Sequence, residues 1–349
     1  MKSFIKRMCF LFFVPACLSA QTLDWKAGMY YFFDNTEFGK STLTDDQTMT
    51  GVHLTPELGI KWENNHGIYA GVDLLKKSGT NDFIDDVKAV VYYRYADGKN
   101  TFYAGAFPRK ALLKNYSAVF IQDSIRYFRP VMNGLFYQSD GDRAFFNVWL
   151  DWTGAQSETM RESFYLGTSG YKAFGTLFAD FQAYLFHYAN TRPSTPTFNV
   201  SEQFLLQLSL GVDLAGKTFF DRLDFSAGVL AGLERRRNTD NGTWIPVGAV
   251  LQLNATYKRF GVENLVYAGQ KRLRLYKQYG GNFYWNTPFL QNEFYALSKW
   301  QIRLFNNKQV DAKIGMNLHF SEKTILFEQV LSLTVELSGR AIEQRKTFE

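Results

Sequence analysis

His319 and Ser321 are the two residues of this sequence whose types and spacing could support nucleophilic chemistry. They stand two positions apart in a segment with strand-like alternation, so both side chains are expected on the same face of a strand. A histidine can take the proton of a neighbouring serine hydroxyl when a third polar group orients the ring, and the serine oxygen then attacks a carbonyl. Such a pair would hydrolyse an ester or an amide.

The spacing of this pair resembles that of the outer-membrane phospholipases. In two respects the sequence departs from that family. It continues Glu322-Lys323-Thr324, where an Asn-Gly would be expected, and alternation places His319 on the polar face of its strand, whereas the family's site faces lipid. The other histidines, His53, His66 and His187, provide no acid–histidine pair, and His53 and His66 have no Asp-rich cluster nearby. We therefore predict that the protein is not an enzyme.

Metal and cofactor motifs are missing from the sequence. It contains no HExxH, no CxxC, no Gly-rich phosphate loop and no His/Asp set with metal-ligand spacing. The prediction is that the protein uses no metal and no cofactor.

Segment 108–131 is the most distinctive charged stretch, because it contains five basic residues and a single acid, Asp123. The basic residues are Arg109, Lys110, Lys114, Arg126 and Arg129. If the segment folds into a pore, a ring of Arg and Lys lowers the barrier for anions and forms a basic constriction. The alternative is an external loop that lies on the rim or contacts lipopolysaccharide phosphates. Segments 235–244 and 269–277 are also basic and could bridge such phosphates, or could be solvated loop tips.

The elements that must position these residues are strands. Segment after segment alternates apolar and polar side chains with period 2, as in 204–214 and 310–320. These segments run to about a dozen residues, whereas strands of soluble proteins usually have about five or six. The length favours strands that cross a membrane, with apolar faces outward and polar faces inward.

Short turns and long polar segments alternate between the strands, which is typical of barrels with short periplasmic turns and long external loops. Counting with this rule predicts about sixteen antiparallel strands in one barrel, with fourteen as the alternative. The predicted strands are 24–33, 50–62, 67–75, 85–95, 101–107, 132–139, 144–153, 163–169, 176–188, 202–214, 222–234, 245–257, 261–268, 292–305, 309–320 and 325–338.

The first twenty residues have the form of a signal peptide, with Lys2, Lys6 and Arg7 before a short apolar run and cleavage expected before Gln21. The expected organisation is therefore a signal peptide over 1–20 and a barrel over 21–349, with 108–131 as its third long loop. Without the leader the 39 basic residues fall to 36 against 33 acids, a net charge of +3 that gives no reason to expect a nucleic-acid partner. Both cysteines leave with the leader, and 17% of the chain is aromatic.

Charged residues on the polar faces would line the lumen and are unevenly distributed. The basic set consists of Lys61, Lys88, Arg94, Lys299, Arg303 and Lys313, and the acidic set of Asp151, Asp180, Asp213, Asp224 and Glu234. Opposed walls of charge would create a transverse field across the pore. The alternative is that these charges pair locally.

By these patterns the chain resembles the porin-like β-barrels of Gram-negative bacteria over residues 21–349. The resemblance implies a sixteen-stranded outer-membrane channel, often a homotrimer, assembled by the barrel-assembly machinery, whose third loop narrows the pore. The predicted function is passive diffusion of small polar solutes, with a preference for anions if segment 108–131 narrows the pore. The alternatives are an outer-membrane barrel with a surface-binding role, or a lipid hydrolase. Outer-membrane lipid and lipopolysaccharide are the expected surroundings.

Overall fold

A computed structural model describes residues 21–110, 116–195, 199–239 and 242–340. The predicted signal peptide and Lys114 lie outside these described residues. Among the described residues no helix is long and apolar enough to cross a membrane.

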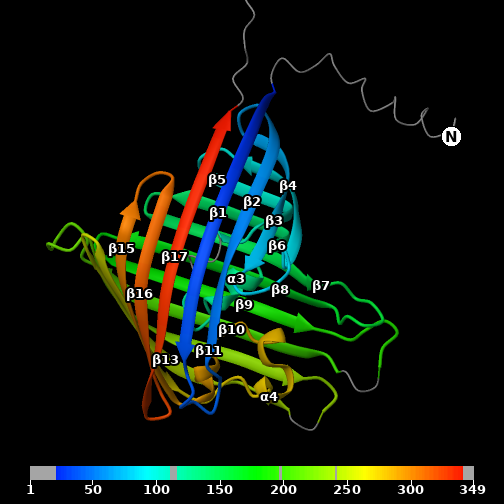
Figure 1. The fold of residues 1–349 in the computed structure, drawn as a ribbon. Coiled ribbons are helices and arrows are strands. Elements are labelled where there is room, and N and C mark those ends of the chain that lie inside the picture. The colour runs from blue at the N-terminus through cyan, green and yellow to red at the C-terminus, as the bar shows by residue number, and fades with distance from the viewer. Residues whose placement is uncertain (1–20, 111–115, 196–198, 240–241, 341–349) are drawn as a thin grey trace, which may run out of the picture.

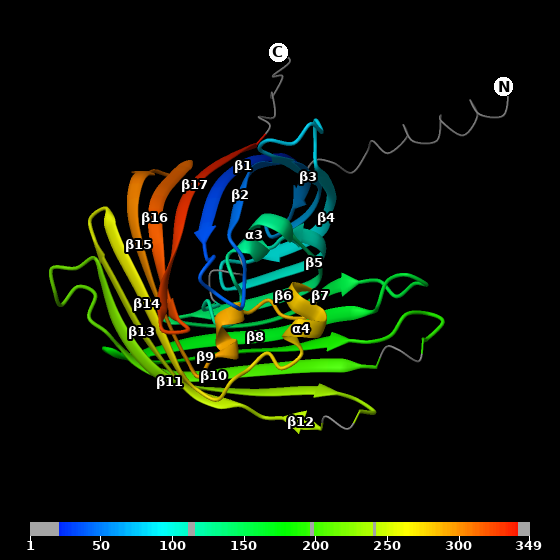
Figure 2. The same cartoon turned by 60° about the horizontal axis from the view of Figure 1, so that its bottom comes forward.

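The chain forms a closed antiparallel barrel of sixteen long strands, as predicted (Figures 1 and 2). Each strand pairs with its neighbours in sequence, and β1 pairs with β17 to close the sheet, with Tyr31 opposite Leu333. The two-residue β12 continues the edge of β13 against β11. The strands are β1 Thr22–Glu37, β2 Gln47–Trp62, β3 His66–Lys77, β4 Asp86–Ala96, β5 Asn100–Pro108, β6 Val131–Gly141, β7 Ala144–Gly154, β8 Ser163–Phe174, β9 Leu177–Tyr188, β10 Ser201–Asp213, β11 Arg222–Arg236, β12 Thr243–Trp244, β13 Val247–Tyr257, β14 Phe260–Gly269, β15 Phe294–Asn306, β16 Val310–Ser321 and β17 Thr324–Arg340.

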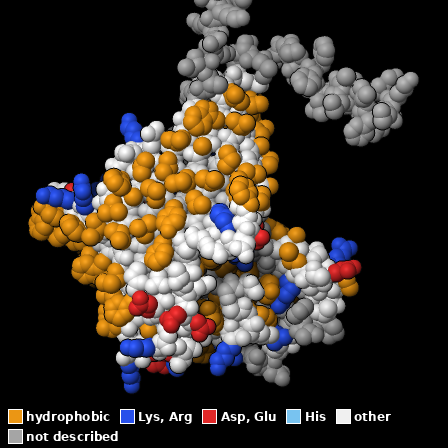
Figure 3. Space-filling model, in the orientation of Figure 1, with side chains coloured by type: hydrophobic (Ala, Val, Ile, Leu, Met, Phe, Trp, Pro, Cys, Tyr) orange, Lys and Arg blue, Asp and Glu red, His pale blue; other side chains and the backbone are white. Residues whose placement is uncertain are grey.

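Alternation along each strand sets which side chains face lipid. On β10, Leu208 and Leu210 are 56% and 71% exposed, whereas Gln207 and Ser209, which alternate with them, are buried inside the barrel. Closure of the sheet pairs the backbone groups between neighbouring strands and leaves no open edge in the lipid. Figure 3 shows the resulting hydrophobic surface over β15–β17 and β1, with charged side chains gathered at the lower end of the view.

The two ends of the barrel differ in their connections. One end carries short turns, such as the one between β2 and β3, where Glu63 and Asn64 adopt positive φ values of 50° and 59°. Both ends of the described chain lie on this side (Figure 1). By the usual rule for such barrels the short-turn end is periplasmic and the long-loop end is extracellular.

Two long loops fold into the barrel instead of extending from it (Figure 2). One is the loop between β5 and β6, which contains helix α3 (Ser124–Phe128), and the other is the loop between β14 and β15, with α4 (Tyr276–Tyr279), η2 (Gly280–Asn282) and η3 (Pro288–Gln291). Phe120 and Trp285 of these loops are 0% and 1% exposed, and Trp285 stacks on the wall residue Tyr165 at 4.0 Å between ring centroids. The hydrophobic core of the protein therefore lies inside the barrel.

Two polar cavities remain inside the barrel wall. A cavity of about 420 Å³ separates the α3 loop from β13–β17, and its lining includes Arg126, Lys299 and Asn317. A second cavity, of about 560 Å³, is lined by wall residues of β7–β14 that include Asp180 and Asp224. The lumen is therefore partly filled and partly hollow.

Candidate functional site

A buried histidine–carboxylate pair lies on the inner face of β16 and β17, near the extracellular end. His319 Nε2 lies 2.9 Å from Glu328 Oε2, and the Tyr295 hydroxyl of β15 lies 2.9 Å from His319 Nδ1. Asn317 Nδ2 also donates to Glu328 Oε2, at 2.6 Å. An ionised carboxylate only accepts hydrogen bonds, so Nε2 carries the ring proton and Nδ1 accepts from Tyr295. The ring is thereby oriented with its basic nitrogen toward a hydroxyl.

Two further acids and a lysine surround this pair. Asp34 of β1 is 1% exposed, interacts electrostatically with Glu328, and has one oxygen without a hydrogen-bond partner among the described residues. Asp123 of the inward loop forms an ion pair with Lys299, which stands opposite Asn317 in the sheet. The cluster around His319 therefore contains three carboxyl groups and one lysine.

Aromatic rings from two extracellular loops cover His319. Phe38, which follows β1, contacts the imidazole edge-on at 5.1 Å, and Phe289 of η3 lies 5.3 Å away. The covering loop 38–46 is fastened to the β16–β17 turn, because Glu322 accepts hydrogen bonds from the Ser41 hydroxyl, at 2.6 Å, and from the Thr42 amide, at 3.1 Å. Burial acts against the charged form of Glu322, but these bonds outweigh it and lower its pKa.

A lipid-facing depression of about 410 Å³ lies just outside this cluster at the same end of the barrel. Ser321 is 3% exposed and accepts a hydrogen bond from Asn292 Nδ2 at 2.8 Å. His319 stands between Asn317, which lines the inner cavity, and Ser321, which lines the depression. The depression is lined by Asn292, Phe294, Phe320, Ser321, Glu322, Lys323, Thr324 and Ile325.

The structure places His319 and Ser321 on one strand face, as alternation predicts, but not as a hydrogen-bonded pair. Both ring nitrogens of His319 have other partners, Glu328 and Tyr295. The sequence analysis missed Glu328, and the two-residue turn after Ser321 could have revealed it. That turn fixes the register of the hairpin and sets Asn317 opposite Glu328.

A second buried histidine–carboxylate pair lies on β2 and β3. His53 Nδ1 is 2.7 Å from Asp73 Oδ1, and His53 Nε2 is 2.9 Å from the backbone carbonyl oxygen of Tyr127 in α3. A carbonyl can only accept, so Nε2 must donate its proton there. This pair fastens the inward loop to the wall.

The basic residues expected at a constriction occupy different places. Arg109 is 2% exposed and lies against Asp151 at 2.5 Å, so it anchors the start of the inward loop instead of lining an opening. Lys110 pairs with Glu336 at 2.6 Å, Arg126 is exposed in the inner cavity, and Arg129 lies over the Trp285 ring at 5.4 Å. Burial of Arg109 follows from the hydrogen bonds it donates to the carbonyls of the same loop.

The predicted lumen charges mostly have partners nearby. Glu234 accepts from the amides of Leu273 and Arg274 and from the Tyr284 hydroxyl, and so holds the second inward loop. Asp180 faces the larger inner cavity. The remaining pairs are Lys61 with Asp24, Lys88 with Asp86, Arg94 with the Tyr103 hydroxyl, Lys299 with Asp123, Arg303 and Lys313 with Asp311, Asp213 with Arg143, and Asp224 with Arg222.

Metal-binding geometry is missing among the residues with described positions, where no group of three or more His, Cys, Asp or Glu side chains is arranged to hold an ion.

The fold matches solved outer-membrane proteins. A loop L8 deletion mutant of OmpT, an outer membrane protein of Vibrio cholerae, aligns with a TM-score of 0.55 and 11% identity, over 91% of this chain and 100% of the other. The in-vitro folded OmpT of the same organism, in its trimer form, aligns with a TM-score of 0.54 and 9% identity over the same shares. At these identities the likeness concerns the fold alone. It defines the protein as an outer-membrane β-barrel, the coarser part of the porin-like resemblance.

A family model described as lipid A 3'-O-deacylase-type matches residues 17–340. The chain therefore belongs to that family. The prediction that the protein is not an enzyme is wrong, because this is an enzyme family. From the sequence a lipid hydrolase is only the lesser alternative, because His319 has no Asn-Gly nearby and lies on the polar face of its strand. Neither reason excludes a site completed by other strands. No curated protein matches the chain in sequence.

Proposed function

We propose that the protein hydrolyses an ester-linked acyl chain of a lipid A-type lipid in the outer leaflet of the outer membrane. The observation that carries this proposal is the Glu328–His319 pair, buried directly behind a lipid-facing depression at the extracellular end. The family to which the chain belongs supports the choice of lipid and of bond.

The reaction follows from the proton positions of the site. A water molecule attacks the ester carbonyl carbon as its proton passes to the Tyr295 oxygen, while the Tyr295 proton passes to His319 Nδ1. The carboxylate of Glu328 stabilises the resulting imidazolium through Nε2. The acyl carbon–oxygen bond then breaks, the alkoxide of the sugar recovers the proton, and a fatty acid leaves.

Ser321 and Asn292 form the polar edge of the depression. Because Ser321 accepts from Asn292, its own hydroxyl proton is available to donate to an ester oxygen. The apolar neighbours Phe294 and Ile325 are about half exposed and would contact the acyl chain. Entry of an ester requires Phe38 and Phe289 to move from the imidazole, and therefore requires loop 38–46 to release Glu322.

The test is incubation of the purified, refolded protein with lipid A in mixed micelles, with mass spectrometry of the products. The expected result is loss of one ester-linked acyl chain, abolished by His319→Ala and by Glu328→Gln. His66→Ala, which changes a histidine at the periplasmic end, is the matched control and is expected to keep the activity. Acyl release that persists in His319→Ala would place the chemistry elsewhere, and no release by the unchanged protein would contradict the proposal.

A second candidate is the channel for small polar solutes predicted from the sequence. It is favoured by the two polar cavities of about 420 and 560 Å³ and by Arg126, which is exposed to the first. The inward loops oppose it, because they pack an aromatic core across the barrel. Single-channel recordings in planar bilayers test it: stable ohmic steps with anion preference support a pore, and silence of inserted protein contradicts one.

A further inference from the structure

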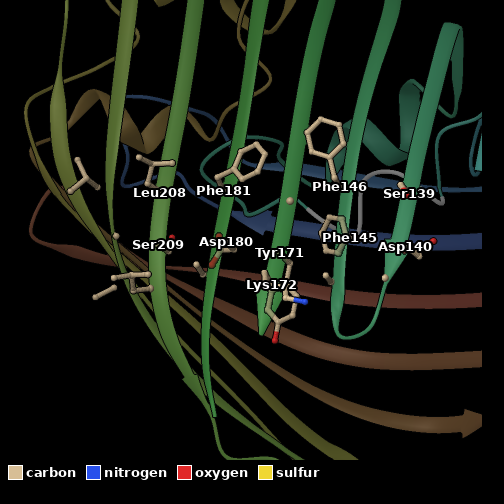
Figure 4. A pocket seen from close by; sticks show the side chains of 18 of the residues that line it. Ser139, Asp140, Phe145, Phe146, Tyr171, Lys172, Asp180, Phe181, Leu208 and Ser209 are labelled. Atoms are coloured by element: carbon tan, nitrogen blue, oxygen red, sulfur yellow. The ribbon is translucent and has the colours of Figure 1, made fainter. Parts of the chain in front are cut away.

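A large apolar groove crosses the outer wall of the barrel far from the proposed hydrolytic site (Figure 4). It has a volume of about 830 Å³ and lies over β7–β11, close to their short-turn ends. This is within the range of about 300–1,000 Å³ typical of sites for small ligands. The volume of the groove is therefore that of a site for a small ligand.

Small residues make the groove deep. Gly170 of β8 stands between Phe146 and Phe181 in the sheet, and a Cβ atom at Gly170 would lie only 2.5 Å from the Phe181 ring. The ring of Phe181 therefore covers part of Gly170. A second row, nearer the turns, contains Ala179 and Ala227, whose short side chains leave space beside the large ones.

Large apolar side chains form the sides of the groove. Leu208, Leu210 and Val229 are 56%, 71% and 53% exposed on the outer face of β10 and β11. They project into lipid, so the surface between them suits a hydrocarbon chain.

Two lysines stand at the periplasmic side of the groove. Lys172 of β8 projects from the outer face in the row of Ala179, and Lys99 lies in the β4–β5 turn. Both are exposed, and neither has an ion-pair partner among the residues that the structure describes. The Lys172 ammonium only donates a long hydrogen bond, 3.4 Å, to the Asp142 carbonyl. Two lysines that form no ion pair among the described residues therefore border the groove.

Among the described residues, the acids that line the groove form no ion pair with these lysines. Asp140 accepts two hydrogen bonds from the Gln138 amide, and Asp180 faces the lumen, where it lines the inner cavity. Lysine stems can lie along apolar surface while the ammonium reaches the headgroup layer. The groove thus combines an apolar body with a cationic end at the level of the periplasmic headgroups.

We propose that this groove binds a glycerophospholipid with an anionic headgroup from the periplasmic leaflet. Its acyl chain lies between Phe181, Leu208 and Leu210, and its phosphate contacts Lys172 and Lys99. The two lysines attract a headgroup with a net negative charge more strongly than a zwitterionic headgroup or an apolar partner surface. A bound lipid of this kind would fill the space beside Ala179 and Ala227.

The test is native mass spectrometry of the delipidated full-length protein titrated with phosphatidylglycerol or phosphatidylcholine. Wild-type protein is expected to retain phosphatidylglycerol preferentially. In the double variant Lys99→Gln/Lys172→Gln, retention of phosphatidylglycerol is expected to fall about tenfold. This is consistent with the contribution of each lysine near an anionic lipid surface. Lys308→Gln, in the β15–β16 turn at the same end of the barrel, is the matched control and should change nothing.

A second variant tests the apolar part of the site. Ala227→Phe fills the groove and is expected to abolish retention of the lipid, whereas Ala249→Phe, on the exposed outer face of β13, should not. Equal retention of both lipids, or retention that survives Ala227→Phe, would overturn the proposal. If Ala227→Phe instead lowers the oligomeric mass and leaves lipid retention intact, the groove is an interface between copies. His319→Ala is expected to leave lipid retention unchanged, so this result is independent of the hydrolytic activity.

Discussion

The barrel contains two buried histidine–carboxylate pairs that differ in their third partner. On β2 and β3, His53 is bound by Asp73 and by the backbone carbonyl of Tyr127. On β16 and β17, His319 is bound by Glu328 and by the Tyr295 hydroxyl. Both rings are buried, at 2% and 8% exposure. The two pairs therefore share a histidine bound to a carboxylate, and both are buried.

The third partner determines what each ring can do. A carbonyl oxygen can only accept, so it fixes a proton on His53 and turns the ring into a fastener between wall and inward loop. A hydroxyl can donate and accept at once, so it leaves His319 with a basic nitrogen connected to a group that can pass a proton on. A buried histidine–acid pair is thus no sign of catalysis by itself, and the group on its far side makes the difference.

Removal of the rings should separate the two roles most strongly. We expect His319→Ala to lower the rate of acyl release by about 100-fold or more, since general acid–base groups contribute roughly 10²–10⁴-fold. His53→Ala should retain most of the rate. The measurement is initial rate on lipid A micelles, with barrel closure checked by heat-modifiable gel mobility. Equal losses in both variants would mean that the two pairs are not distinguished by their third partner.

The hydroxyl itself is the next test. We expect Tyr295→Phe to lower the rate by about 10- to 100-fold, because the ring of His319 stays in place but loses the group that relays the proton. Tyr93→Phe is the matched control, since the Tyr93 hydroxyl contacts the Nδ1 of His66 at 2.6 Å, far from the site. An unchanged rate in Tyr295→Phe would show that water reaches His319 directly.

The fastening role of His53 predicts a loss of stability. His53→Ala leaves Asp73 buried without its partner and releases the α3 carbonyl, which costs about 1–3 kcal/mol for an unsatisfied buried group. The expected result is a lower free energy of unfolding in urea, in lipid micelles, with increased proteolysis of the loop between β5 and β6. A loss of the same size in His319→Gln, and none in His53→Ala, would reverse the assignment of the two roles.

The sequence predicted the architecture well because period-2 alternation is a local signal. The sixteen strands, including the nine-residue β5, follow from side chains that alternate between lipid and lumen. The same alternation placed His319 and Ser321 on the inner face. What the sequence did not reveal depends on contacts across strands and loops: Asp34 approaches the His319–Glu328 pair only after β1 closes on β17.

The inward loops show the same limit. The basic residues of segment 108–131 suggested a constriction, but charge alone does not tell whether an arginine faces water or a buried acid. Arg109 meets Asp151, 42 positions along the chain, because the loop turns back against β7. Its apolar residues Val119 and Phe120 are buried among wall residues that are spread over many strands.

The smallest effect should come from loop 38–46, which covers His319 and is held by Glu322. Glu322 fastens loop 38–46 in its charged form, and its pKa is lowered in the folded protein. A lowered pKa means that the fastening is fully present above the unfolded value of about 4.3 and is lost as the pH falls through the folded value. Hydrogen exchange of the Thr42 amide should therefore be slow at neutral pH and faster in acid, and Glu322→Gln should speed it at neutral pH by a few-fold. If the variant exchanges like the wild type at every pH, the carboxylate does not hold the loop, and access to His319 must be controlled by Phe289 and η3.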